Sequence, residues 1–201
     1  MKLYVSPGAC SLAPHIALTI AGLPFTVERV SLKSKALAGG GDFREINDKG
    51  SVPALQLDDG RVLTEAAVLL QYIADQAPES GLAPAHGSFE RYQVMEWLNY
   101  IATEVHKRFT PIFTPGCTEE GRQAAWSALA RPLGYLAGKL ENQQFLMGER
   151  FNIADLYLFT VLNWVGFAKF SLEGWPALQA YQARVAAIPA VQEALRAEGL
   201  A

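Results

Sequence analysis

A chain of 201 residues, half of them hydrophobic and 18% charged, has an ordinary globular composition and room for one large domain or two small ones. Its formal net charge of −3 leaves no dense basic face for a nucleic-acid partner. The apolar run at the start is too short for a signal peptide, the longest apolar stretch (153–170) falls short of a membrane span, and two cysteines make no disulfide framework. We therefore expect a reduced, cytoplasmic protein without a membrane partner.

The first half of the chain alternates strand and helix patterns. Residues 2–5 form a short predicted strand that the turn Ser6-Pro7-Gly8 ends, and helical periodicity then runs from Ser11 to Ala21. Apolar and polar residues alternate over 25–30, which predicts a second strand. A strand, a helix and a strand with a crossover of this length make a βαβ unit, and hence a right-handed parallel pair.

A hairpin and a helix complete this half. The pattern predicts strands over 52–57 and 61–63, because Asp58-Asp59-Gly60 between two apolar runs is a strong hairpin signal. Thr64 is the expected N-cap of a helix over 65–76. The expected buried stripe of this helix includes Val68, Leu69, Tyr72 and Ile73. The order βαβ and then ββα predicts a small α/β domain over residues 1–77.

The sequence pattern of the second half of the chain predicts helices. Residues 78–87 are rich in proline, glycine and small side chains, and we place the domain linker there. Residues 88–201 form a predicted all-α domain with helices over 89–113, 119–141, 153–167 and 175–187 and a short one after Pro189. Asn152 and Asp155 form a variant capping box before the third of these helices. That helix is apolar nearly all round, so we expect it at the centre of the domain.

Five sequence blocks resemble the beta-class bacterial glutathione S-transferases. In chain order they are SPGACSLAPHIAL, GSVPAL, LTEA, WLNYIATEVHKRFTP and FNIADLYLF. The resemblance implies a thioredoxin-like N-terminal domain, an all-α C-terminal domain, glutathione as co-substrate, no metal, and a homodimer. It implies a detoxifying glutathione transferase that activates the thiol of glutathione for attack on hydrophobic or halogenated electrophiles.

Cys10 lies between the first strand and the first helix. Its sulfur would face unpaired backbone N–H groups and the positive helix end, a position that lowers a thiol pKa from about 8.5 to about 4–7. The alternative is a small buried hydrophobe, which is what a lone cysteine usually is. The resemblance implies that Cys10 hydrogen-bonds the glutathione sulfur or forms a mixed disulfide with it. Tyr4 and Ser11 are the possible substitutes in that role.

The helix over 89–113 carries the second group of candidates. Asn99, Thr103 and His106 are spaced i, i+4, i+7 and should share a face, which could also be only the solvated side. An unperturbed histidine pKa of about 6.5 suits His106 to hold or take the thiol proton. The resemblance implies that Asn99 and His106 contact the glutathione thiol, and that Thr103, Glu104 and Lys107 also bind glutathione, some of them from the partner subunit.

The resemblance also assigns contacts to the cysteinyl and γ-glutamyl units of glutathione. Val52-Pro53 matches a cis proline that would present the N–H and C=O of Val52 to the cysteinyl unit of glutathione, like an added strand; the alternative is a plain edge-strand proline. Glu65 would pair with the γ-glutamyl ammonium, and the N–H of Ala66 would receive its carboxylate. From the residues alone, Glu65 would be only a helix-dipole partner.

Lys35 is the residue that the resemblance assigns to the glycine carboxylate of glutathione, with Lys33 as a nearby alternative. The cleft for the electrophile is expected to include Phe109, Phe113, Trp164 and Phe167. No metal or phosphate-loop motif appears, and Ala13 stands where a Cys-x-x-Cys motif would need its second cysteine. Two alternative functions stay open: a thiol transferase or disulfide reductase acting through a Cys10 mixed disulfide, and a non-catalytic ligand-binding protein of the same fold.

Overall fold

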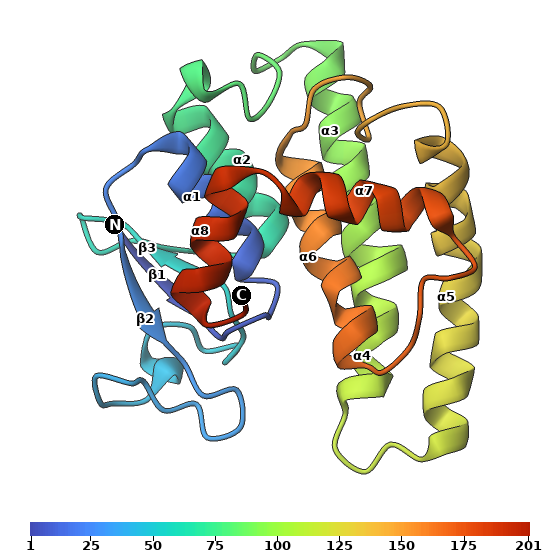
Figure 1. The fold of residues 1–201 in the computed structure, drawn as a ribbon. Helices are drawn as coiled ribbons and strands as arrows, with labels where there is room; N and C mark the ends of the chain where they lie inside the picture. The colour runs from blue at the N-terminus through green and yellow to red at the C-terminus, as the bar shows by residue number, and fades with distance from the viewer.

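The computed structural model describes residues 1–201, with a small sheet and its helices in the first part of the chain and helices alone in the rest (Figure 1). The strands are β1 (Lys2–Val5), β2 (Thr26–Arg29), β3 (Ala54–Gln56) and β4 (Val62–Thr64). The α-helices are α1 (Leu12–Ala21), α2 (Ala66–Gln76), α3 (Phe89–Tyr100), α4 (Lys107–Phe113), α5 (Glu119–Leu140), α6 (Ile153–Phe167), α7 (Pro176–Ala186) and α8 (Pro189–Glu198). Short 3-10 turns, η1 (Phe43–Glu45) and η2 (Pro78–Ser80), and a π-helical segment, η3 (Ile101–His106), complete the chain.

The sheet has the strand order β2-β1-β3-β4. β1 runs parallel to β2 and antiparallel to β3, and β3 pairs with β4 as a hairpin. Both the parallel pair and the hairpin predicted from the sequence are therefore confirmed. α1 and α2 pack together beside the sheet, where their apolar faces join the main core with Leu3, Val5 and Leu55 of the strands.

The predicted helix over 89–113 is one rod with an interruption. α3 and α4 are joined by η3, a π-helical segment with six residues. A π turn carries an extra residue, so side chains on its two sides do not follow the spacing of a regular α-helix. This change of register decides which side chains of the rod reach the site.

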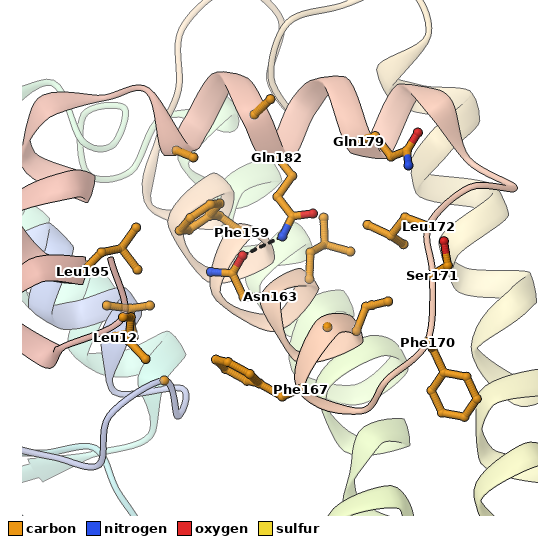
Figure 2. Close-up of a pocket in the computed structure, with 17 residues that line it drawn as sticks. Leu12, Phe159, Asn163, Phe167, Phe170, Ser171, Leu172, Gln179, Gln182 and Leu195 are labelled. Atoms are coloured by element: carbon orange, nitrogen blue, oxygen red, sulfur yellow. Dashed lines mark hydrogen bonds between the residues drawn. The ribbon is translucent and has the colours of Figure 1, made fainter.

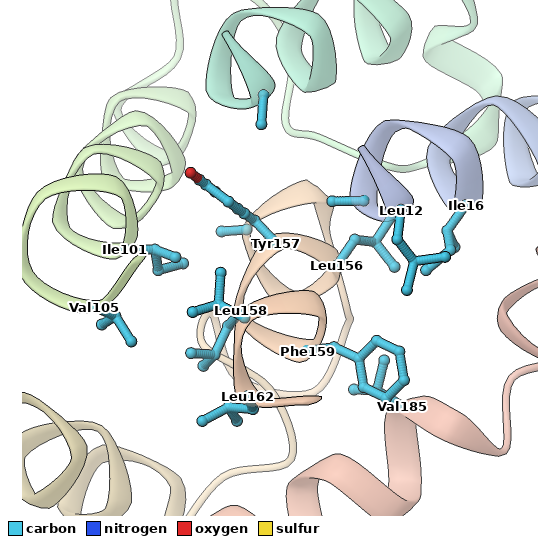
Figure 3. Packing of buried hydrophobic residues seen from close by; sticks show 14 of the residues in the cluster. Leu12, Ile16, Ile101, Val105, Leu156, Tyr157, Leu158, Phe159, Leu162 and Val185 are labelled. Carbon is cyan, nitrogen blue, oxygen red and sulfur yellow. The ribbon is translucent and has the colours of Figure 1, made fainter. Parts of the chain in front are cut away.

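α6 lies at the centre of the helical part, as its apolar sequence predicted, and Figure 3 shows its side chains meeting those of α1, η3 and α7. The capping box at its start is confirmed. Asn152 Oδ1 accepts from the N–H of Ala154, and Asp155 Oδ2 accepts from the N–H of Asn152, both at 2.9 Å. Because α6 also packs on α1 and α2, one continuous core joins the two parts of the chain.

Two expectations for α2 are wrong. Thr64 is not the N-cap: it ends β4, and Glu65, with a φ of +71°, turns the chain into the helix without a side-chain cap. Val68 is 44% exposed, and Leu70 takes its place beside Leu69 in the core. The turn at Glu65 rotates the start of the helix, which a spacing argument alone does not register. No helix combines the length and the apolar character needed to cross a membrane.

Candidate active site

A cavity of about 810 Å³ lies between the sheet part and the helical part. It gathers most of the side chains predicted from the sequence to bind glutathione. Those that line it are Cys10, Lys35, Val52, Pro53, Glu65, Ala66, His106 and Lys107. They come from the loop before α1, the loop before β3, the start of α2, and the rod formed by α3, η3 and α4.

Three predicted residues do not line this cavity. Asn99 and Thr103 are exposed, and the Thr103 hydroxyl donates to the Asn99 carbonyl at 3.1 Å. Glu104 instead pairs with Arg108 one turn further along. The predicted common face of Asn99, Thr103 and His106 assumed a regular α-helix, and η3 breaks that register. Ala102 and His106 face the cavity in this segment.

The Cys10 thiol is held by burial and by a backbone carbonyl. Its Sγ–H donates to the carbonyl of Val52 at 3.3 Å. The N–H groups of Cys10 and Ser11 lower its pKa, as its place before a helix predicts, but burial outweighs them and raises the pKa to about 12, with a smaller contribution from Glu65. The expected lowering of this pKa is therefore wrong. A buried thiol that donates to a carbonyl is held in its neutral form.

Neither candidate substitute for Cys10 lines the cavity. The Tyr4 hydroxyl donates to Gln56 Oε1 at 3.0 Å inside the sheet part. Ser11 is fully buried and braces the preceding turn, because its Oγ donates to the Ser6 carbonyl and accepts from the Ser6 N–H, each at 3.2 Å. Of these three candidates, Cys10 is therefore the one that lines the cavity.

The loop before Cys10 is anchored to the helical part through Gly8. Trp164 on α6 donates its Nε1–H to the Gly8 carbonyl at 2.7 Å, and Glu198 on α8 accepts from the Gly8 N–H at 2.9 Å. Glu198 also bonds Nδ1 of His15 at 2.8 Å. Both polar backbone groups of Gly8 are therefore occupied by the second half of the chain.

His106 is largely buried among aromatic rings. Its Nδ1 lies 2.7 Å from the hydroxyl oxygen of Tyr157, and its ring meets that of Trp164 edge to face with centroids 4.6 Å apart. Burial, helped by the charge of Lys107, lowers the pKa of His106 to about 4. The imidazole is therefore neutral at pH 7. His106 does not have the pKa near 7 that would suit a group which takes up and releases the thiol proton.

The Val52–Pro53 peptide bond is cis, as the resemblance implied. The Val52 N–H has no hydrogen-bond partner in the protein, although Val52 is largely buried and lines the cavity. A buried N–H without a partner is uncommon, so a ligand with a backbone carbonyl would satisfy it.

The start of α2 presents a carboxylate and free N–H groups. The first N–H groups of a helix have no helical partner, which leaves those of Ala66 and Ala67 open to an anion. Glu65 bonds Lys49 at 2.8 Å, and Lys49 also donates to Thr64 Oγ1 at the same distance. Lys49 lines the cavity, and the sequence reasoning missed it because a loop lysine carries no distinguishing pattern.

Lys35, not Lys33, lines the cavity, so the structure separates the two alternatives by position. On the opposite wall lie Phe113, Trp164 and Phe167, as expected for an apolar cleft. Phe109 is wrong as a lining residue: it is fully buried behind this wall and stacks on Phe113 with centroids 6.2 Å apart.

Tyr157 is a lining residue that the sequence reasoning did not single out. It lies on α6, in the block FNIADLYLF, between the apolar residues Leu156 and Leu158. The sequence did indicate a polar contact here, because a tyrosine on a helix expected in the core needs a hydrogen-bond partner for its hydroxyl. The identity of that partner, His106, depends on how α6 packs against η3.

A second cavity of about 710 Å³ opens on the other side of Phe167, between α6, α7 and α8 (Figure 2). Its walls carry no charged side chain, and its polar groups include Asn163 and Gln182, which bond each other across it. It shares Gly8 and Phe167 with the first cavity but contains none of the residues predicted to bind glutathione. The chemistry suggested by the sequence therefore belongs to the first cavity.

Comparisons with known proteins cover both parts of the chain. The family model for the N-terminal domain of glutathione S-transferases matches residues 8–76, and that for the C-terminal domain matches residues 100–189. Glutathione S-transferase GstA of Escherichia coli O157:H7 is 48% identical over 200 residues, 100% of each chain. The ternary complex of BphK, a bacterial GST, aligns with a TM-score of 0.97 at 53% identity over 100% of each chain. A sphingomonad glutathione S-transferase complexed with glutathione aligns with a TM-score of 0.95 at 45% identity, again over 100% of both chains.

Proposed function

The chain belongs to the glutathione S-transferase family and is a glutathione S-transferase, and on that premise we propose that its first cavity binds glutathione and activates the thiol beside Cys10 and His106. The observation that carries the proposal is the gathering, in one cavity, of a separate complementary group for each part of the tripeptide. The two alternative functions considered from the sequence are not favoured by the comparisons.

In the proposed pose glutathione lies extended along the sheet part. The unpaired Val52 N–H pairs with the backbone of the cysteinyl unit, as in strand addition. The γ-glutamyl end lies at the start of α2, where Glu65 takes the ammonium and the Ala66 N–H takes the carboxylate. The glycine carboxylate lies toward Lys35, with Lys107 at the far side of the thiol.

The thiol of glutathione would then lie next to two neutral groups. The same burial that raises the pKa of Cys10 also disfavours a ligand thiolate, so the site must supply hydrogen-bond donors to the sulfur. A neutral Cys10 thiol can donate to that sulfur once its Sγ–H turns away from the Val52 carbonyl, but it is a poor nucleophile. We therefore favour a hydrogen bond over a mixed disulfide for Cys10.

The electrophile would bind against the aromatic wall. Phe113 and Phe167 are 47% and 55% exposed, and with Trp164 they offer flat apolar surface next to the thiol position. Such a wall suits hydrophobic or halogenated small molecules, and conjugation of these compounds is a detoxification reaction. Both cysteines are free, which fits the reducing cytoplasm that we propose as the location.

A homodimer is the remaining part of the proposal. Large exposed hydrophobic side chains gather on the rod and on α5: Phe89, Tyr92, Met95 and Tyr135. Several large exposed apolar side chains on neighbouring helices are typical of a protein interface. Asn99, Thr103 and Glu104 lie on the same rod outside the cavity, so any contact they make with glutathione would be with a partner subunit's ligand or through a change on binding.

Glu65→Gln tests the placement of glutathione. Loss of the carboxylate should weaken glutathione binding about three- to fivefold, because an ion pair at this largely exposed side chain contributes roughly 0.7–1 kcal/mol. Titration calorimetry with glutathione measures the change. Glu79→Gln, outside the cavity, is the matched control and should bind like the wild type. Unchanged binding by Glu65→Gln would contradict the pose.

A further inference from the structure

Tyr157 reaches the cavity from the centre of the helical part. Its ring leaves α6 on the side that faces η3, the segment that carries Ile101 and Val105 (Figure 3). The residue is 3% exposed, and its only side-chain hydrogen bond is the one to Nδ1 of His106. A buried hydroxyl with one partner must direct its proton to that partner or leave it unsatisfied.

From this geometry we propose that Tyr157 is a positioning residue: its O–H donates to Nδ1 of His106 and so fixes the tautomer that carries its proton on Nε2. The proposal rests on the proposed function, in which His106 serves the thiol of glutathione. A neutral imidazole has one N–H, and the hydrogen bond made by one nitrogen decides which nitrogen carries it.

The opposite arrangement satisfies fewer groups. If Nδ1–H donated to the tyrosine oxygen, the Tyr157 hydroxyl proton would have no acceptor among the groups of the protein. Donation from Tyr157 therefore satisfies both partners, and it leaves Nε2–H of His106 as a donor. The imidazole plane is held by Trp164, whose ring is perpendicular to it at 89°.

The charged and titratable groups around His106 agree with a neutral ring. Those that share its cavity are Cys10, Lys35, Lys49, Glu65, Lys107 and Tyr157. Lys107 disfavours the imidazolium and Glu65 favours it, but burial is the largest effect. The pKa of Tyr157 is raised far above its ordinary value by burial, so its hydroxyl stays protonated and able to donate.

The consequence concerns the role of His106. With its proton on Nε2 and Nδ1 occupied, His106 has no free lone pair and cannot accept the thiol proton. It acts as a hydrogen-bond donor that stabilises the glutathione thiolate, and the proton leaves to solvent. Tyr157→Phe should free the ring to adopt either tautomer, which would reduce the fraction able to donate.

The test combines a direct view of the tautomer with kinetics. ¹⁵N spectra of histidine-labelled protein, assigned with His106→Ala, should show the wild-type His106 protonated on Nε2 and the Tyr157→Phe variant as a mixture. In the same variant kcat with an aryl halide at pH 6.5 should fall about three- to tenfold, the range that one hydrogen bond of about 0.7–1.4 kcal/mol gives, with KM for glutathione unchanged. The apparent pKa of the bound glutathione thiol, from the pH profile of kcat/KM for the aryl halide at saturating glutathione, should rise.

Tyr181→Phe is the matched control, because Tyr181 is equally buried and donates to Asp155 away from the cavity. It should lose stability without moving the pH profile or the His106 tautomer. Protonation of His106 on Nδ1 in the wild type, or a wild-type profile in Tyr157→Phe, would overturn the inference. If His106→Ala left the pKa of bound glutathione unchanged, the proposed role of His106 would fail, while the spectra would still decide the tautomer.

Discussion

At Cys10 two opposing effects act on one sulfur atom. The N–H groups of Cys10 and Ser11 stabilise a thiolate, and burial disfavours it. Both effects have the sign that elementary electrostatics gives, but burial is the larger one, so the thiol stays neutral. At His106 burial also selects the neutral form. Cys10 and His106, the two polar groups nearest the proposed thiol position, are thus uncharged. The charged groups that act on them are Glu65, which affects both, and Lys107, which affects His106.

Because burial raises the pKa of Cys10 to about 12, we expect its thiol to react slowly with disulfides near neutral pH. In a Cys117→Ser background, where Cys10 is the only cysteine, its reaction with an aromatic disulfide at pH 8 should be at least about 50-fold slower than that of free glutathione. The estimate combines a thiolate fraction lower by about three orders of magnitude with the greater reactivity of a more basic thiolate. The rate should rise with pH well beyond 9. Urea-unfolded protein is the control and should react normally; a folded protein that titrates below pH 8 would contradict the structure.

At the scale of single elements, α6 and the rod formed by α3, η3 and α4 position the site residues in different ways. The capping box gives α6 a defined start, and its apolar surface places it at the centre of the core. That placement brings Tyr157 and Trp164 to the cavity. In the rod, η3 rotates His106 toward the cavity and leaves Thr103 exposed. A folding motif and a helix irregularity therefore both decide which side chains reach the site.

Asp155→Ala tests the start of α6. The Asp155 carboxylate accepts from the N–H groups of Leu146 and Asn152 and from the Tyr181 hydroxyl, all of them buried. Removing it leaves these donors unsatisfied, so the free energy of unfolding should fall by about 3 kcal/mol or more. Urea denaturation measures the loss.

The pH dependence of that loss has a defined sign. Burial raises the pKa of Asp155 to about 6, so its stabilising contribution is fully present below the ordinary value near 4 and declines as pH rises through 6. The difference between wild type and Asp155→Ala should therefore be larger at pH 4 than at pH 7. Asp42→Ala, which removes an exposed cap from η1, is the control and should cost well under 1 kcal/mol. A kcat/KM of the folded Asp155 variant that differs from wild type would show that the motif serves the site as well as the fold.

At the scale of the whole molecule, the loop that carries Cys10 is shaped by the helical part. Gly8 has a φ of +74°, and both of its polar backbone groups bond side chains of α6 and α8. A Cβ at this position would lie 2.9 Å from Cε2 of Phe167. The two parts of the chain therefore form the site together, and neither alone would hold Cys10 in place.

Gly8→Ala tests this dependence against Gly22→Ala. Both glycines have positive φ, +74° and +63°, so each substitution should cost about 1 kcal/mol in backbone strain. Gly22 has no neighbour for the added methyl group, whereas Gly8 meets Phe167. Gly8→Ala should therefore lose roughly 1–3 kcal/mol more in thermal or urea unfolding. It should also lose activity, because Cys10 is two residues away.

A double variant supplies the decisive comparison. Gly8→Ala combined with Phe167→Ala should recover the stability difference between the two glycine substitutions, because the clash with the ring is then gone. Equal losses for Gly8→Ala and Gly22→Ala in the wild-type background would mean that Phe167 moves aside freely and does not hold the loop.

The order of the elements follows from sequence patterns alone. Periodicity, turn residues and caps predicted the parallel pair, the hairpin, the bounds of α6 and the presence of a helical second half, because these signals act between residues close together in the chain. Eight of the eleven residues that the family resemblance assigned to glutathione binding line the cavity. The domain boundary predicted at 78–87 stays a prediction.

Tertiary packing decided what local patterns cannot contain. The exposure of Val68 and the loss of Thr64 as a cap come from the turn at Glu65. The pKa values of Cys10 and His106 depend on how many atoms from distant segments surround them, and burial is a property of the packed molecule. The pairing of His106 with Tyr157 joins residues 51 positions apart, so it exists only once α6 has packed against η3.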